Sequence, residues 1–322
     1  MNRKQQWKTL ALVSALSVNL AACGGGSSEP VEQNASFSLA VSDAPVDGVD
    51  KVMLCFGSVE LVGNGLGNQT FTPGLESVTA NNNSECRDST GAVVANSIGV
   101  DLLTLPGATS LSLISQATVP AGNYGQMRLN IVPGSYIQLS DGTQYPLEVP
   151  SNQLRLNGVT LSAGGTFSYT LEFDLRKAMV LANPQKYLLK PTGLRLVNTS
   201  EIGHLEGVVS EAFLLANNCA VAPADQNQPV AAVYLYPGSD LELSSLADYG
   251  GTETVLPYAS APVLFDGASA YSYELGFIDA GNYTAALTCQ LNDEPEQNDQ
   301  LVFLQGKNLT ITSSATPVQL DF

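Results

Sequence analysis

Hydrophobic and polar side chains alternate with a period of two along much of the chain. The clearest run is 167–174, Phe-Ser-Tyr-Thr-Leu-Glu-Phe-Asp, and the same period recurs at 37–42, 127–131, 233–236 and 309–312. Successive side chains of a β-strand point to opposite faces of the sheet, so this period predicts half-buried strands.

Short clusters of Gly, Asn, Asp and Ser separate the alternating runs, as at 140–142, 157–158 and 266–267. Helical periodicity is missing over long windows, and the best candidate for a short helix is 175–182. Many short strands with such turns are typical of antiparallel sandwiches. We therefore predict an all-β fold.

One tetrapeptide, Ala-Gly-Asn-Tyr, occurs twice, at 121–124 and at 280–283, each time before an alternating run. A tight turn in which Gly adopts a positive φ, followed by an aromatic side chain at the mouth of the core, would explain it. The repetition favours two sandwiches of related design.

The first 22 residues have the pattern of an export signal. They begin with three cations, continue with an apolar run over 10–20 and end in Leu20-Ala21-Ala22, directly before Cys23. This order resembles the lipobox of bacterial lipoproteins. The resemblance implies a signal peptide at 1–22, a Cys23 acylated with palmitate-type chains, and an anchor that holds the protein to a membrane without spanning it.

The residues after Cys23 bear on destination and spacing. Gly24 stands where an Asp signals inner-membrane retention in many Gram-negative lipoproteins, so the resemblance implies the outer membrane, on its periplasmic or its surface side. Residues 23–35 are rich in Gly, Ser and polar side chains, and we expect a flexible tether there.

Six segments between residues 36 and 199 carry a family resemblance: 42–47, 59–61, 100–105, 120–129, 173–178 and 187–197. In this order they are similar to the family called domain of unknown function 4382, which implies no activity.

The second half has a resemblance of its own. The strand at 233–236, the turn at 276–284 and the closing run at 318–322 are similar to prealbumin-like modules of the carboxypeptidase-regulatory and collagen-adhesin B types. We therefore predict two antiparallel β-sandwich domains of immunoglobulin or prealbumin type in tandem, at 36–200 and 201–322.

Four cysteines remain once Cys23 is assigned to lipid: Cys55, Cys86, Cys219 and Cys289. An even number in an exported chain favours disulfides. Three pairings are formally open. A domain boundary near residue 200 selects Cys55–Cys86 and Cys219–Cys289, one bridge in each domain.

The charge balance narrows the class of partner. The chain of 322 residues has 13 Lys and Arg against 30 Asp and Glu, a net charge of −17, which becomes −20 without residues 1–22. Such a charge repels phosphate backbones and excludes nucleic acid as a partner. With 44% hydrophobic and 13% charged residues, the composition is that of a folded protein.

Catalytic motifs are scarce. His204 is the single imidazole, and the chain has neither a Gly-x-Ser-x-Gly elbow nor a phosphate-binding Gly-rich loop. We therefore predict a non-catalytic protein. Two alternatives stay open: an envelope hydrolase that uses a carboxylate pair, whose sequence spacing is undefined, and a small outer-membrane β-barrel, suggested by the terminal Phe322.

Seven tyrosines crowd the second half and could stack on sugars, although strand aromatics more often pack in a core. They are Tyr234, Tyr236, Tyr249, Tyr258, Tyr271, Tyr273 and Tyr283.

Two acidic loops are candidate calcium sites, since Ca²⁺ takes oxygen ligands. The first holds Asp43, Asp47 and Asp50, and the second, after Cys289, holds four acids. Neither fits the EF-hand pattern, and Asx turns or a solvated hairpin tip would equally explain them. The second set is Asp293, Glu294, Glu296 and Asp299.

The stretch 63–97 is the longest irregular run, with Asn81, Asn82 and Asn83 at its middle. Loops of this length are usually functional or disordered, and this one is our candidate contact surface. Taken together, these patterns predict a lipid-anchored envelope protein that acts as a binding, adhesion or structural module. We expect no cofactor other than Ca²⁺, and a surface polysaccharide or an envelope protein as partner.

Overall fold

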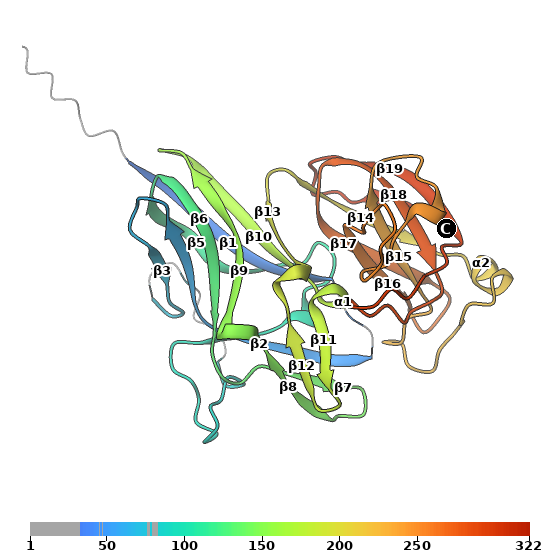
Figure 1. Cartoon of the computed structure of the whole chain (residues 1–322), viewed down its shortest axis with the longest axis horizontal. Helices are drawn as coiled ribbons and strands as arrows, with labels where there is room; N and C mark the ends of the chain where they lie inside the picture. The colour runs from blue at the N-terminus through green and yellow to red at the C-terminus, as the bar shows by residue number, and fades with distance from the viewer. Residues whose placement is uncertain (1–32, 45, 47, 76–77, 79–82) are drawn as a thin grey trace, which may run out of the picture. The chain divides into compact units, whose positions relative to one another are not determined.

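The computed structural model describes residues 33–44, 46, 48–75, 78 and 83–322 (Figure 1). The predicted signal peptide and Cys23 lie outside this part of the chain. Residues 32–322 form one compact unit, so the predicted boundary between residues 200 and 201 stays a prediction. Strands are by far the main regular elements of the unit, which confirms the all-β class.

The first sheet has four strands in the order β13-β10-β1-β5. They are β13 (Leu194–Asn198), β10 (Thr166–Asp174), β1 (Asn34–Ala44) and β5 (Leu111–Pro120). β1 runs parallel to β10 and antiparallel to β5. A parallel pair needs a long connection, which the chain between residues 44 and 166 provides.

The second sheet is arranged around the long strand β2 (Val49–Gly63). Its path is β11-β12-β8-β7-β2-β6-β9, and β3 (Gln69–Phe71) and β4 (Ile98–Asp101) also pair with β2. The remaining strands are β6 (Gly122–Ile131), β7 (Tyr136–Leu139), β8 (Gln144–Glu148), β9 (Gln153–Leu161), β11 (Met179–Asn183) and β12 (Lys186–Leu189).

One hydrophobic core joins these two sheets. Phe37, Leu39 and Val41 of β1 pack in the same cluster as Leu61 of β2 and Leu129 of β6, and each is at most 1% exposed. The alternation at 37–42 therefore has the predicted outcome: one face of β1 lies in the core of a sandwich.

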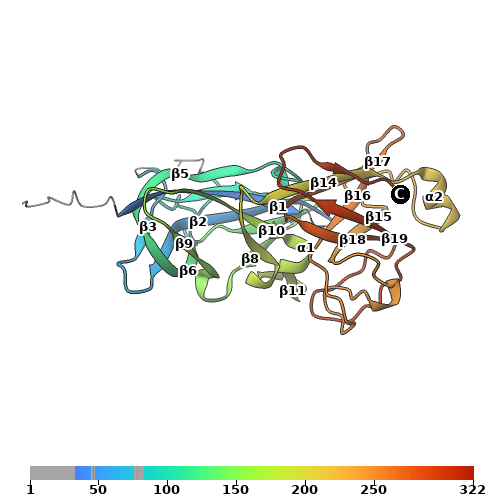
Figure 2. The same cartoon turned by 90° about the horizontal axis from the view of Figure 1, so that it is seen from above.

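The third sheet has seven strands in the order β19-β18-β15-β16-β17-β14-β20, and Figures 1 and 2 show β15, β16, β17 and β18 in one group. They are β14 (Ile202–Val208), β15 (Ala231–Pro237), β16 (Ala259–Phe265), β17 (Tyr271–Asp279), β18 (Gly281–Thr288), β19 (Gln305–Ile311) and β20 (Val318–Gln319).

Both faces of β15 are buried. Val233 and Leu235 join the larger cluster on one face, and Tyr234 and Tyr236 join a smaller cluster with Phe303 on the other. The loops that follow β15 and β18 therefore cover the second face of this sheet.

Helices are short. α1 (Leu175–Ala178) begins after Asp174, whose side chain accepts the Lys177 N–H, and α2 spans Glu211–Ala216. The predicted helix at 175–182 is correct only for its first turn, because the residues that follow form β11 and pair with β12. Four 3-10 turns complete the helical elements of the described residues. Within the same residues, no helix is long and apolar enough to cross a membrane.

Candidate functional site

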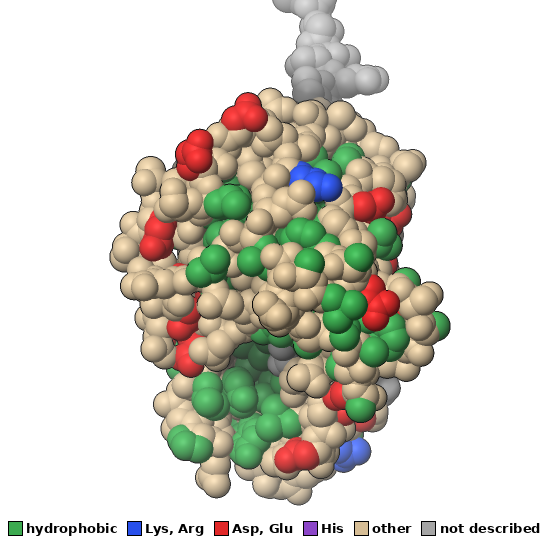
Figure 3. Space-filling model, turned by 90° about the vertical axis from the view of Figure 1, so that its right-hand side faces the viewer, with side chains coloured by type: hydrophobic (Ala, Val, Ile, Leu, Met, Phe, Trp, Pro, Cys, Tyr) green, Lys and Arg blue, Asp and Glu red, His purple; other side chains and the backbone are tan. Residues whose placement is uncertain are grey.

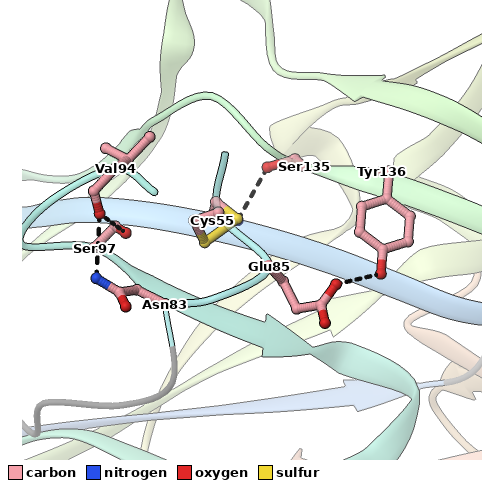
Figure 4. The surroundings of a disulfide bond; sticks show 8 residues. Cys55, Asn83, Glu85, Val94, Ser97, Ser135 and Tyr136 are labelled. Carbon is pink, nitrogen blue, oxygen red and sulfur yellow. Dashed lines mark hydrogen bonds between the residues drawn. A yellow bond between two sulfur atoms is a disulfide. The ribbon is translucent and has the colours of Figure 1, made fainter. Parts of the chain in front are cut away.

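Both predicted disulfides are present. Cys55 of β2 is bonded to Cys86 with a Cα–Cα distance of 5.6 Å, and Cys219 to Cys289 with one of 5.5 Å. The first bridge is fully buried beside Ser135, whose hydroxyl accepts the Cys55 N–H at 3.0 Å (Figure 4). Disulfides form and persist in oxidising compartments, so both bonds are typical of an exported protein.

The predicted contact loop is only partly described. Asn81 and Asn82 lie outside the described residues. Asn83 lies beside the first disulfide, where its side-chain amide donates to the Val94 carbonyl at 3.2 Å; the Ser97 hydroxyl donates to the same oxygen at 2.7 Å (Figure 4). Asn83 thus holds its own segment together, and a contact role for this loop stays a prediction.

The first acidic loop is also partly described. Asp43, one residue before the end of β1, has a fully buried carboxylate, and neither of its oxygens has a hydrogen-bond partner among the described residues. Asp50 is exposed on β2 and accepts a hydrogen bond from Ser140 at 3.0 Å. Asp47 lies outside the described residues, so the calcium site expected here stays a prediction.

Three carboxylates from two distant segments meet at the second acidic loop. Asp293 and Asp299 belong to this loop, and Asp248 follows the 3-10 turn Leu243–Ser245. One carboxylate oxygen of each lies within 4.8 Å of those of the other two. In the part of the chain that the structure describes, this is the one group of three acidic, His or Cys side chains with that spacing. We call it the acidic triad.

Hydrogen bonds hold the triad in place. Asp248 Oδ2 accepts the Asp299 N–H at 2.6 Å. Asp293 accepts the Tyr249 N–H at 3.3 Å and the Tyr234 hydroxyl at 2.5 Å. Burial raises the pKa of Asp293 to about 6, although the hydrogen bond from Tyr234 lowers it. The two glutamates predicted with this loop are not in the triad: Glu296 pairs with Lys190, and Glu294 accepts from Gln297.

A groove of about 660 Å³ lies beside the triad. β11 and the start of β2 form one wall, and residues 291–297 form the other. Hydrophobic side chains line a hollow on the face shown in Figure 3. Tyr234 connects two of the polar groups of the groove, Arg176 and Asp293: its hydroxyl accepts from Arg176 at 3.2 Å and donates to Asp293. Further polar side chains of the lining include Glu294, Glu296 and Gln297.

A second set of charges is buried where β10 ends. Glu172 and Asp174 are at most 1% exposed. Arg195 of β13 lies 3.9 Å from Glu172, donates to the Tyr258 carbonyl at 2.8 Å and stacks on the Tyr258 ring at 4.4 Å. Asp174 accepts a hydrogen bond from Tyr249. These contacts connect the first sheet to residues of the third sheet and its loops.

Burial is the main cause of the pKa shifts among these buried carboxyl groups. It raises the pKa of Glu172 to about 8, against the opposing effect of the Arg195 guanidinium. The pKa of Asp43 lies well above its usual value because of burial and because Glu172 adds a like charge.

His204 and most of the predicted tyrosines have structural positions. The Nδ1 atom of His204 accepts the Phe277 N–H at 3.3 Å, and its ring meets the Phe277 ring edge-on at 5.1 Å. Five of the seven tyrosines are at most 5% exposed, which is the core packing that strand aromatics usually have. These are Tyr234, Tyr236, Tyr271, Tyr273 and Tyr283.

The sequence predicted two members of the acidic triad, Asp293 and Asp299, as part of the second acidic loop. The segment 173–178 carried only the family resemblance, although its Asp174 and Arg176 contact residues from the second half of the chain. Asp248 was missed because it lies 45 residues before Asp293 and carries no local signal. Glu172 and Arg195 were missed because their positions in alternating strands predict exposure to solvent.

The fold and the bonds define a disulfide-bonded all-β protein. Within it, residues 34–191 match the family described as "Domain of unknown function (DUF4382)", which confirms the resemblance seen in the sequence. A comparison with curated proteins gives no match.

Similarity to solved structures is low. A leucine-rich repeat protein from Bacteroides thetaiotaomicron aligns with 90% of this chain at 11% identity and a TM-score of 0.18. A streptococcal ancillary pilin also aligns with 90% of the chain, at 12% identity and a TM-score of 0.17. The chain spans 26% of the first protein and 62% of the second. TM-scores of this size do not indicate a shared fold.

Proposed function

We propose that this protein is a lipid-anchored protein of the bacterial outer membrane that binds a partner without transforming it. The observation that carries this proposal is the pair of disulfides in an all-β body. Such bonds are typical of exported proteins, and residues 1–23, which end in Leu-Ala-Ala-Cys, have the pattern of an export signal followed by an acylation site. We also propose that residues 203–322 form a prealbumin-like module.

The groove is the surface that best fits a partner. Its walls carry Val49, Leu139, Met179 and Leu291, and Arg176 supplies a fixed, buried cation. Carbohydrate sites usually offer exposed aromatic faces for stacking, whereas most of the tyrosines here are buried. The groove therefore suits an extended segment of an envelope protein better than a polysaccharide.

Two variants test the anchor and the groove in cells. Cys23→Ala should move the protein from the membrane fraction to the soluble fraction, because no acyl chain can then be attached. Retention of this variant in the membrane would contradict lipid anchoring.

A photo-crosslinking side chain at position 181 then tests the groove. Leu181 lines the groove and is 56% exposed, while Leu256 is 60% exposed and lies outside it. We expect position 181, but not position 256, to crosslink to one envelope protein, and Met179→Asp to abolish that product. Equal crosslinking at both positions would refute the groove as the binding surface. Binding of purified polysaccharide without a crosslink would refute the choice of partner, and release of cleavage products would favour the hydrolase.

A further inference from the structure

The acidic triad combines three like charges with a buried oxygen that has no partner. Asp248 is 2% exposed, and its Oδ1 accepts no hydrogen bond, while Oδ2 is occupied by the Asp299 N–H. A buried carboxylate oxygen without a donor is costly, and two more carboxylates within 4.8 Å add repulsion.

The neighbouring cations do not neutralise this charge. Lys190 reaches the same loop but pairs with Glu296. Arg176 shares the Tyr234 hydroxyl with Asp293 and lowers the pKa of Asp293, but burial still raises that pKa to about 6. Glu253 adds a further negative charge that acts on Asp248. The arrangement thus offers oxygen ligands and a net negative charge to a positive ion.

We infer that Asp248, Asp293 and Asp299 bind a calcium ion. Ca²⁺ prefers carboxylate oxygens, accepts irregular geometry and completes its shell with water, so three protein ligands suffice for a weak site. Each carboxylate oxygen has two lone pairs, so the hydrogen bonds to Asp293 and Asp299 leave capacity for a metal bond. The softer His and Cys ligands that favour zinc or copper are absent from this group.

The bound ion would hold one wall of the groove in place. Residues 291–297 form that wall, and Cys289, bonded to Cys219, fixes the start of the loop. Its far end is held by the hydrogen bond from Asp299 to Asp248. Calcium would bind both segments and so order the loop between Asp293 and Asp299. This inference does not depend on the identity of any partner.

Calorimetric titration of the full chain, isolated from the envelope and freed of cations with EGTA, tests the site. With CaCl₂ as the probe, we expect saturable heat with a Kd on the order of 10⁻⁴ M, as in extracellular modules, and a higher unfolding temperature. Asp248→Asn and Asp299→Asn should each weaken binding at least about tenfold. Glu294→Gln removes the same charge from the same loop but lies outside the triad, and it should retain affinity within about threefold.

The unfolding temperature provides a second measurement that does not require the variants to bind. In EGTA, Asp248→Asn should unfold at a higher temperature than wild type, because it removes one of three repelling charges. In excess Ca²⁺ this order should reverse. Three results would each overturn the inference. The first is absence of heat at 10 mM CaCl₂, a concentration about 100 times the expected Kd. The others are a rise in unfolding temperature that NaCl of equal ionic strength reproduces, and a loss of Ca²⁺ affinity in Glu294→Gln equal to that in the triad variants.

Discussion

Glu172 shows how a single residue can depart from its pattern. It occupies a polar position of an alternating strand, yet it is fully buried. Its register partners are Ser42 on β1 and Arg195 on β13, so the sheet places one cation and one hydroxyl beside it. Asp174 and Asp43 are the like charges that act nearby. Because burial outweighs the effect of Arg195, the protonated form of Glu172 is favoured in the folded state below about pH 8.

This balance predicts how stability depends on pH. The pKa of Glu172 is about 8 in the folded protein, against 4.5 for an unperturbed glutamate. The folded state therefore binds more protons than the unfolded state between these values, and the stability contributed by this group falls as the pH rises through that window. We expect Glu172→Gln to flatten this dependence and to gain at least about 1 kcal/mol over wild type at pH 8.

Urea unfolding at pH 5, 6.5 and 8 measures this effect. Glu148→Gln is the control, because Glu148 is an exposed glutamate whose ion pair with Lys186 contributes little. An equal pH slope in wild type and Glu172→Gln would show that Glu172 titrates normally in the folded protein.

At the scale of elements, the tyrosine of the repeated tetrapeptide makes the same contact twice, whereas the positive φ predicted for its glycine occurs at Gly122 and not at Gly281. Tyr124 and Tyr283 are buried in separate cores, and each hydroxyl donates to the carbonyl four residues upstream, of Pro120 at 2.8 Å and of Asp279 at 2.9 Å. The bond ties the start of β6 or β18 to the end of the preceding strand. A buried tyrosine that bonds back to the backbone in this way also fixes a corner in immunoglobulin-type sandwiches.

Removal of each hydroxyl should therefore weaken its own corner. Tyr124→Phe and Tyr283→Phe keep the ring and lose one buried hydrogen bond, and we expect each to lower the free energy of unfolding by about 1 kcal/mol. Tyr145→Phe is the control, because the Tyr145 hydroxyl has no hydrogen bond to another described residue. Chemical denaturation of the three variants tests this, and a loss of the same size in Tyr145→Phe would contradict the role of the corner.

Element type was readable from the sequence, whereas strand partners were not. Alternation located β1, β6, β10, β15 and β19, because a strand that borders a core must alternate. Alternation does not identify a neighbour, so it gave no sign that β1 and β10 run parallel. It also predicts one exposed face, which is wrong for β15 and for the end of β10, where a second layer covers the sheet. The disulfides were predictable because an even set of cysteines leaves few pairings.

At the scale of the molecule, the candidate sites depend on contacts between distant segments. Asp248 meets Asp293, and Arg195 meets Tyr258, only after the sheets have formed. No local pattern encodes such meetings, which is why two acidic residues of the triad were found in the sequence and the third was not. Three hydrogen bonds of buried side chains cross from the segment 172–195 to the second half: Arg195 to Tyr258, Asp174 to Tyr249 and Arg176 to Tyr234. The ion pair of Lys190 with Glu296 also crosses, nearer the surface.

These buried links predict that the two cores unfold together. Residues 32–322 form one compact unit although they hold separate hydrophobic clusters, and these links, with the small apolar cluster of Val197, Ile202 and Phe277, join the two. We expect one calorimetric transition for wild type. Arg195→Met removes the hydrogen bond to the Tyr258 carbonyl and the stacking on the Tyr258 ring, and it should separate the unfolding into two transitions.

Two further variants make this prediction specific. Arg155→Met is the matched control, because Arg155 is exposed on β9 and bonds only to Gln153, so it should leave the single transition unchanged. Adding Glu172→Gln to Arg195→Met should change the stability little below pH 8, because Glu172 is already protonated there, and the lost bond to Tyr258 should keep the two transitions apart. Two transitions in wild type would show that the cores are independent. A single transition in Arg195→Met would mean that Asp174 and Arg176 couple the cores without Arg195.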